Sequence, residues 1–150
     1  MSQAEIKHRI GIKASPDQVF NALIDAAAIS KWWTKAEGVS AVGKTIGVDF
    51  RGFIQPLKVT RMAPSKLVSL QPAEEGVPAW VNTSIEFRLA RDEKNDQTLL
   101  YFTHAGYTAS DDFFSKCSTN WAVYLISLKE LVETGKGRPF PNNIECDHDS

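Results

Sequence analysis

The chain has 150 residues, of which 43% are hydrophobic, 10% aromatic and 23% charged, a composition typical of a globular domain rather than a disordered or fibrous chain. Seventeen basic and eighteen acidic residues give a formal net charge of −1, so there is no basic excess of the kind that binds nucleic acid or an anionic membrane. No run reaches the ~20 apolar residues of a membrane span. We expect a single domain, 1–150, with its core at about 6–135 and a polar C-terminal tail at 136–150.

The two cysteines do not form a disulfide framework. Cys117 falls on an apolar helical stripe, whereas Cys146 falls in the polar tail. Because the sequence also shows no secretory signal, we expect a cytoplasmic protein whose thiols are reduced.

The first expected elements are a strand and two short helices. Apolar and charged residues alternate over 6–13, which predicts a half-buried strand. Ser15 is followed by a proline and, three residues on, by Gln18, which is the pattern of a capping box at a helix start. A second short helix is expected over about 26–33, with Asp25 as its cap. Because such short helices are unstable alone, both should pack on a sheet.

The middle of the chain predicts a run of strands separated by turns. The expected strands lie at about 45–51, 57–62, 67–70, 80–89 and 98–105. The strand at 80–89 has the clearest alternation, and its inward face would carry Val81, Thr83, Ile85, Phe87 and Leu89. The charged segment 92–97 predicts the turn that joins this strand to the next.

The last strong element is a long amphipathic helix over about 110–135. Its apolar residues recur at gaps of three and four, which is helical spacing. This stripe consists of Phe113, Phe114, Cys117, Trp121, Tyr124, Leu125, Leu128, Leu131 and Val132. Asp111 and Asp112 suit the positive end of the helix dipole, and Gly135 predicts the end of the helix.

The order of elements predicts an α+β fold. Consecutive strands joined by short turns form an antiparallel meander, and one face of that sheet needs a cover. The terminal helix is the one expected element large enough to supply it. We therefore expect a curved antiparallel sheet of about six strands, two short helices after the first strand, and the long C-terminal helix packed across the sheet.

Three motifs give the chain a resemblance to a known family. The segment 12–20, I-K-A-S-P-D-Q-V-F, resembles the opening "I-x-A-x-P-x-x-V-[FW]" of the START-like superfamily, also called the Bet v 1-like or polyketide cyclase/dehydratase group (SRPBCC). The pair at 32–33 resembles the aromatic pair that closes its second helix. The segment from Asn120-Trp121 through Leu128-Lys129 to Gly135 resembles the end of one branch, the homologues of the activator of heat shock protein 90 ATPase.

This resemblance covers about residues 6–140 and implies a helix-grip fold. In this fold a curved antiparallel sheet wraps around the terminal helix, usually with an apolar cavity between them. Asn120 departs from the pattern, because a glycine often precedes the tryptophan, so cavity dimensions do not carry over. Members include lipid carriers, hormone-binding proteins, cyclases, dehydratases and chaperone regulators. The fold therefore does not fix the activity.

The candidate ligand-binding residues lie on the helix stripe and on the expected inner face of the sheet. They are Trp32, Trp33, Phe50, Trp80, Thr83, Ile85, Phe87, Leu100, Phe102, His104, Phe113, Phe114, Cys117, Trp121, Tyr124 and Leu128. Two interpretations fit them: they line a cavity, or they fill a solid core. Because neighbouring helical residues point about 100° apart, at most one of Trp32 and Trp33 should face inward.

His104, His8 and Tyr107 are the candidates for proton transfer. Both histidines fall on the apolar face of a strand, and they would lie close together if the first and last strands pair antiparallel. The alternative is that both histidines have ordinary structural partners. The sequence shows no metal-binding cluster, no nucleotide motif and no complete catalytic constellation, so we expect neither a metal nor a cofactor.

Three functional hypotheses follow. The first is a module that binds a small hydrophobic or amphipathic molecule between the sheet and the terminal helix. The second is an enzyme of the cyclase or dehydratase kind that uses a pocket histidine. The third is a protein–protein interaction module that regulates a chaperone. The oligomeric state and the identity of the ligand stay open.

Overall fold

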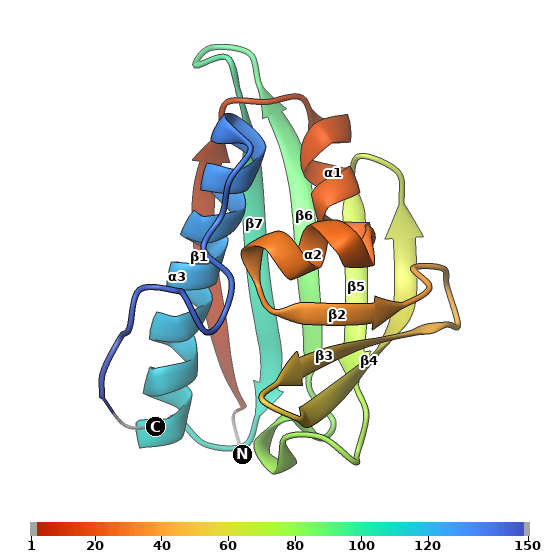
Figure 1. The fold of residues 1–150 in the computed structure, drawn as a ribbon, viewed down its shortest axis with the longest axis vertical. Helices are drawn as coiled ribbons and strands as arrows, with labels where there is room; N and C mark the ends of the chain where they lie inside the picture. Colours follow the sequence, from red (N-terminus) through yellow and green to blue (C-terminus); the bar gives the residue numbers. More distant parts are fainter. Residues whose placement is uncertain (1–2, 149–150) are drawn as a thin grey trace.

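The computed structural model describes residues 3–148 and consists of an antiparallel sheet with the helices on one face (Figure 1). The strands are β1 (Ala4–Ile12), β2 (Lys35–Gly38), β3 (Thr45–Phe50), β4 (Phe53–Ala63), β5 (Leu67–Pro72), β6 (Ser84–Asp92) and β7 (Gln97–Tyr107). The helices are α1 (Pro16–Ile24), α2 (Ala26–Trp32), the single 3₁₀ turn η1 (Pro78–Trp80) and α3 (Asp112–Thr134). The expected α+β helix-grip architecture is confirmed.

The strands form a meander to which the first strand is added at one edge. Their order in the sheet is β1-β7-β6-β5-β4-β3-β2, and every pairing is antiparallel. The pairing of the first and last strands is as expected, with Ile6 opposite His104 and His8 opposite Phe102. This register places the two histidines on the same face, two positions apart along the ladder.

Both short helices begin where the sequence predicts. The Ser15 hydroxyl accepts a hydrogen bond from the Gln18 backbone N–H at 3.2 Å, and the Gln18 side chain accepts one from the Ser15 N–H at 3.0 Å. Asp25 caps α2 by accepting a hydrogen bond from the Ala27 N–H at 3.1 Å. These bonds satisfy N–H groups that a helix start leaves without partners.

Helix α3 crosses the sheet on the side of β1, and the chain after it turns back along the helix (Figure 1). Asp111 is its N-cap and accepts a hydrogen bond from the Phe114 N–H at 2.9 Å. Gly135 ends the helix with a φ of 87°, in the left-handed region that glycine adopts without a steric penalty. The C-terminal tail therefore reverses direction and reaches the front of the molecule.

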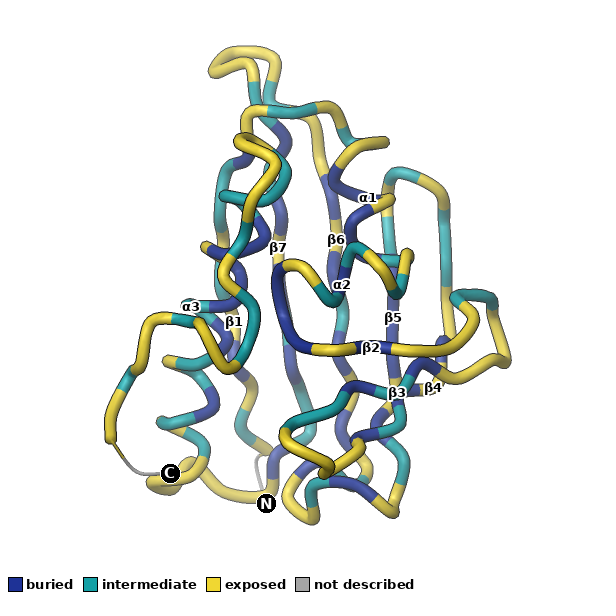
Figure 2. The backbone as a smooth tube through the Cα atoms, in the orientation of Figure 1, coloured by how far each residue is buried: buried dark blue, intermediate teal, exposed yellow. Residues whose placement is uncertain are grey.

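The core lies between the sheet and the helices, as the buried inner parts of the strands show (Figure 2). At its centre the Phe102 ring lies 4.5 Å from the Trp121 ring and 5.3 Å from the Phe87 ring, measured between centroids. Leu125 and Leu128 of α3 are fully buried beside them. The middle of the sheet–helix space is therefore solid.

The expectation that a strand starts at Trp80 is wrong, because β6 begins at Ser84. Pro78 instead starts the 3₁₀ turn η1, and Asn82 adopts a φ of 66°. The Thr83 N–H then donates to the Trp80 carbonyl at 3.0 Å, which closes the turn. This turn directs Trp80 into the interior rather than along a strand.

The sheet has seven strands where about six were expected, because Lys35–Gly38 forms the edge strand β2. In this four-residue strand the buried position is Ala36, which is too short a pattern to detect in the sequence. The Thr34 hydroxyl donates to the Asp49 carbonyl at 2.5 Å and holds the strand against β3. Within residues 3–148, no helix is both long enough and apolar enough to cross a membrane.

Candidate functional site

A cavity of about 650 Å³ lies at one end of the sheet–helix space, between the first half of α3, the β3–β4 turn, η1 and the C-terminal tail. Its lining comprises Trp33, Phe50, Arg51, Val77, Trp80, Phe113, Lys116, Cys117, Asn120, Trp121, Tyr124, Phe140, Pro141, Asn143, Glu145, Cys146, Asp147 and His148. The Phe113 side chain is 42% exposed, so the cavity is open to solvent on that side.

One wall of the cavity is a connected series of aromatic rings. The Trp33 and Trp121 rings lie 4.9 Å apart, and the Trp80 ring stacks on Trp121 at 6.2 Å with the planes 19° apart. Phe50 meets Trp33 edge-on at 6.2 Å and meets Phe140 edge-on at 5.3 Å. Aromatic rings in such contact form a large, rigid apolar surface.

Seven of the predicted binding residues line this cavity: Trp33, Phe50, Trp80, Phe113, Cys117, Trp121 and Tyr124. They come from the C-cap of α2, from β3, from η1 and from α3, which the fold brings to one end of the sheet. Of the adjacent tryptophans, Trp33 lines the cavity, whereas Trp32 packs in the core and its indole N–H donates to the Ala22 carbonyl at 2.8 Å.

The other nine predicted binding residues lie outside the cavity: Trp32, Thr83, Ile85, Phe87, Leu100, Phe102, His104, Phe114 and Leu128. Most are buried in the solid part of the interior, and Phe114 packs edge-on against Tyr107 with ring centroids 5.1 Å apart. The reason is that β6 and β7 pass beneath the middle of α3, where large side chains from both layers already fill the space. Some of the predicted residues therefore line a cavity, and the others fill a solid core.

His104 is fully buried and hydrogen-bonded at both ring nitrogens. Trp121 Nε1 lies 3.2 Å from its Nδ1, and the Tyr107 hydroxyl lies 3.1 Å from the same atom. Because an indole N–H can only donate, Nδ1 must accept and the ring proton must be on Nε2. Nε2 then donates to the Thr83 hydroxyl at 2.9 Å, and that hydroxyl donates to the Trp80 carbonyl at 2.6 Å.

The surroundings of His104 keep it neutral. Burial lowers the pKa of its imidazole from 6.5 to about 3, since a charged ring would lose its hydration without gaining a counter-ion. His8 lies two ladder positions away, where its Nε2 faces the Ser118 carbonyl at 3.0 Å and its ring stacks on Phe102. Neither histidine lines the cavity, so this geometry does not support proton transfer by them to a molecule bound there.

A polar corner lies where Tyr107, Cys117 and Trp80 meet. The Trp80 indole N–H is near the Tyr107 hydroxyl and the Cys117 thiol, yet it makes no hydrogen bond of good geometry among the described residues. Burial raises the pKa of both the Tyr107 hydroxyl and the Cys117 thiol, so both groups stay protonated near neutral pH. Burial also raises the pKa of Tyr124, another lining residue, to about 12.

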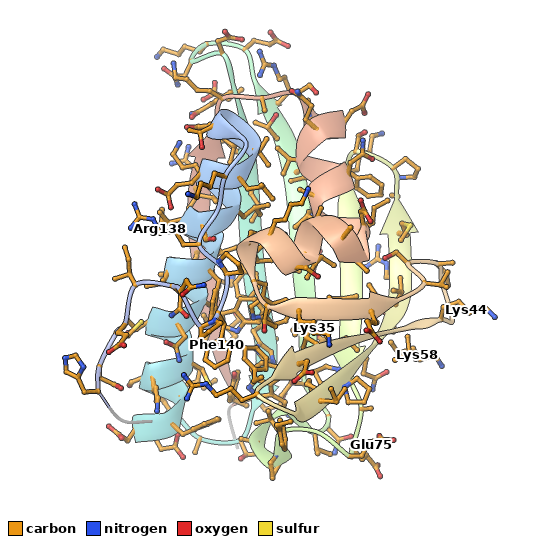
Figure 3. The ribbon with its side chains drawn as sticks, viewed as in Figure 1. Lys35, Lys44, Lys58, Glu75, Arg138 and Phe140 are labelled. Atoms are coloured by element: carbon orange, nitrogen blue, oxygen red, sulfur yellow. The ribbon has the colours of Figure 1, made fainter. Side chains whose placement is uncertain are left out.

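The tail forms the wall that sequence reasoning did not identify. The Phe140 N–H donates to the Trp33 carbonyl at 2.7 Å, and the Arg138 N–H donates to the Ser127 hydroxyl at 2.7 Å. Figure 3 shows Phe140 between α3 and β3, with Arg138 on the outer side of the helix. A large ring between two prolines in a polar tail was the one signal that could have indicated this anchoring.

The polar lining residues come mainly from the β3–β4 turn, one side of α3 and the tail. Arg51, Lys116 and Asn120 lie on the first two elements, and the tail adds Glu145, whose carboxylate pairs with the His148 ring at 2.9 Å. Within residues 3–148 no group of three or more His, Cys, Asp or Glu side chains is arranged to hold a metal ion. The cavity is therefore an apolar site with a charged rim.

Comparison with known proteins identifies the family. Residues 13–133 match the family model described as activator of Hsp90 ATPase homolog 1-like protein. The chain belongs to this family. The matched residues include α1, α2, β2–β7 and almost all of α3, but they end before the tail that closes the cavity.

Several solved structures are similar to this chain in fold. The solution structure of the Aha1 dimer from Colwellia psychrerythraea is 42% identical, with a TM-score of 0.82, and the match covers 89% of this chain and 99% of that one. Protein MLL2253 from Mesorhizobium loti is 19% identical, with a TM-score of 0.74 and coverage of 86% and 96%. CalU16 from Micromonospora echinospora is 22% identical, with a TM-score of 0.73 and coverage of 97% and 76%. The last two likenesses show the fold alone, and no curated protein sequence matches the chain.

Proposed function

We propose that this protein binds a small hydrophobic or amphipathic molecule in the cavity between the sheet, α3 and the tail. The supporting observation is the cavity of about 650 Å³ walled by Trp33, Trp80 and Trp121. Its volume is within the roughly 300–1,000 Å³ of small-molecule sites, which combine apolar walls with a few polar groups. The Trp80 N–H without a partner adds support, because a buried donor gains from a ligand or water that accepts its hydrogen bond.

A cavity-filling substitution tests this proposal. Asn120 is half-buried on α3 and lines the cavity beside Trp121. Asn120→Trp should occupy the space and weaken binding of an apolar probe by about ten-fold or more, because the probe loses aromatic contact area. Asn120→Ala should keep or enlarge the space and bind at least as well as the natural chain. The measurements are probe titration by tryptophan fluorescence and native mass spectrometry of protein taken directly from cells.

The matched control is Thr119→Trp, which adds the same side chain at an exposed position outside the cavity. It should bind the probe as the natural chain does. If Asn120→Trp folds normally and binds with unchanged affinity, the molecule is not bound in this cavity and the proposal is wrong.

A second proposal is that the chain regulates the ATPase of an Hsp90-type chaperone, supported by the description of its family. Ile54, the second residue of β4, is 47% exposed and offers an apolar contact point, whereas its neighbour Phe53, which is 48% exposed, points to the opposite face of the strand. We expect the purified chain to raise the rate at which an Hsp90-type chaperone hydrolyses ATP, with an effect that saturates as the concentration of the chain increases. Ile54→Ser should reduce that effect. Ile126→Ser, at a 44% exposed site on α3, is the control.

The chaperone experiment also provides samples for a measurement of the oligomeric state, which the sequence leaves open. Light scattering of the same samples measures the oligomeric state, since the relative from Colwellia psychrerythraea is described as a dimer. Failure to alter ATP hydrolysis at any concentration would reject the regulatory role but not the cavity function. We also propose a cytoplasmic location, for which the free thiols of Cys117 and Cys146 are the supporting observation.

A further inference from the structure

Arg51 occupies an unusual backbone position at the rim of the cavity. It is the first residue of the two-residue turn that joins β3 to β4, with a φ of 55°, and Gly52 follows with a φ of 91°. Turns with positive φ at both positions favour asparagine, aspartate or glycine at the first position. A long side chain there is therefore held in a sparsely populated conformation, which raises the question of what its head group does.

The Arg51 guanidinium faces an aromatic ring rather than a carboxylate. Its central carbon lies 5.4 Å from the centroid of the Phe140 ring, a distance at which a cation is attracted to the face of the ring. Arg88, Arg91 and Arg138 each pair with a carboxylate, whereas Arg51 forms no ion pair with any residue in the described range 3–148. Its five donors therefore remain available at the cavity rim.

Phe140 links this cation to the aromatic wall. Its ring meets Phe50 at 5.3 Å on one side, and its backbone is fixed to Trp33 by the hydrogen bond from its N–H. The guanidinium is thus kept beside the apolar surface on which the body of a ligand would lie. A planar fork of donors in this place matches an acceptor group with two oxygens on one atom.

From this juxtaposition we infer that the ligand is an amphipathic monocarboxylate, whose apolar body lies against the tryptophan wall and whose carboxylate pairs with Arg51. This inference rests on the proposed binding function and specifies its ligand class. A single unpaired guanidinium balances one negative charge. The tail carboxylates of Glu145 and Asp147 also line the cavity, and they disfavour a ligand with two negative charges.

The experiment compares three probes with the same ten-carbon chain: decanoate, decan-1-ol and decyltrimethylammonium. Binding is followed at pH 7.5 by tryptophan fluorescence, because three of the four tryptophans line the cavity. The natural chain should bind decanoate about two- to five-fold more tightly than decan-1-ol, the range expected for an ion pair at an exposed site, and should bind the cation least tightly.

Substitutions separate the charge of Arg51 from its shape. Arg51→Gln should bind decanoate and decan-1-ol equally, and Arg51→Lys should recover only part of the preference because it keeps the charge but not the fork. Lys44→Gln is the matched control, because Lys44 directly precedes β3, at the opposite end of that strand from Arg51, and does not line the cavity (Figure 3). That variant should keep the full preference for decanoate.

The outcomes distinguish the inference from the binding function on which it rests. If decan-1-ol binds as tightly as decanoate, or if Arg51→Gln keeps the preference, the ligand class is wrong while the cavity still binds apolar molecules. If none of the three probes changes the tryptophan fluorescence or is retained in native mass spectrometry, both the inference and the binding function are rejected.

Discussion

At the scale of single residues, His104 illustrates how a buried polar side chain becomes structural. Its Nδ1 accepts from Trp121 and its Nε2 donates to Thr83, so the ring joins α3 to the loop before β6. Protonation would place a donor opposite the Trp121 N–H and a charge in the core. The residue that resembled a catalytic acid or base in the sequence thus fixes the position of a tryptophan in the cavity wall.

We predict that His104 makes the free energy of unfolding depend on pH. The unfolded chain takes up a proton as the pH falls below 6.5, whereas the folded chain does not do so until about pH 3. Stability should therefore be complete above pH 6.5 and fall by about 1.4 kcal/mol for each pH unit below it. His104→Asn should flatten this slope and lower the stability at pH 7 by about 1–3 kcal/mol. Urea unfolding followed by fluorescence between pH 5 and 7.5 measures both effects.

His8→Asn is the control, because His8 is partly exposed and bonds to a backbone carbonyl, so this variant should keep the slope. The neighbours of His104 in the polar corner, Tyr107 and Cys117, stay neutral in this range. Hydrogen bonds from the Gln97 and Asn95 side chains hold the pKa of the Asp92 carboxylate below its ordinary 3.8, which is outside this range. An equal slope in the natural chain and in His104→Asn would show that another group titrates.

At the scale of elements, local signals predicted the helices well. Ser15 and Asp25 cap helices as expected, because a cap depends on side chains within three residues of it. Asp111 was expected in the first turn of the long helix and is instead its N-cap. The long strands were also found, since alternation over many residues averages out local exceptions. The short strand β2 was missed because its position is set by hydrogen bonds to β3, which are tertiary contacts.

The error at β6 has a different origin. The alternation of apolar residues continues back from Ile85 through Thr83 to Val81, so the pattern alone predicts a longer strand. The backbone nevertheless turns at Asn82, and Trp80 enters the cavity wall from η1. An alternating pattern does not reveal a turn when the residues before the turn face the cavity and the residues after it belong to a strand of the sheet.

At the scale of the whole molecule, the sequence could not separate core from cavity. Phe113, Trp121 and Leu128 share one helical stripe, yet Leu128 is in solid core and the other two line the cavity. The difference depends on how far each side chain lies from the solid core beneath the middle of α3, and on where the tail packs against the helix. The spacing of residues along a helix encodes neither of these.

The return of the tail leads to a prediction about the whole chain, namely that it unfolds as one cooperative unit that includes residues 138–148. Ending the chain after Gly137 removes the Phe140 ring from Phe50 and the two backbone bonds to Trp33 and Ser127, so the free energy of unfolding should fall by about 2 kcal/mol. Ending it after Asn143 keeps those contacts and is the matched control. Urea unfolding by fluorescence and by far-ultraviolet circular dichroism should give one coincident transition for the full chain. If the full chain and the chain that ends after Gly137 are equally stable, the tail does not contribute to the folded structure. The cavity would then lack the wall that the tail forms.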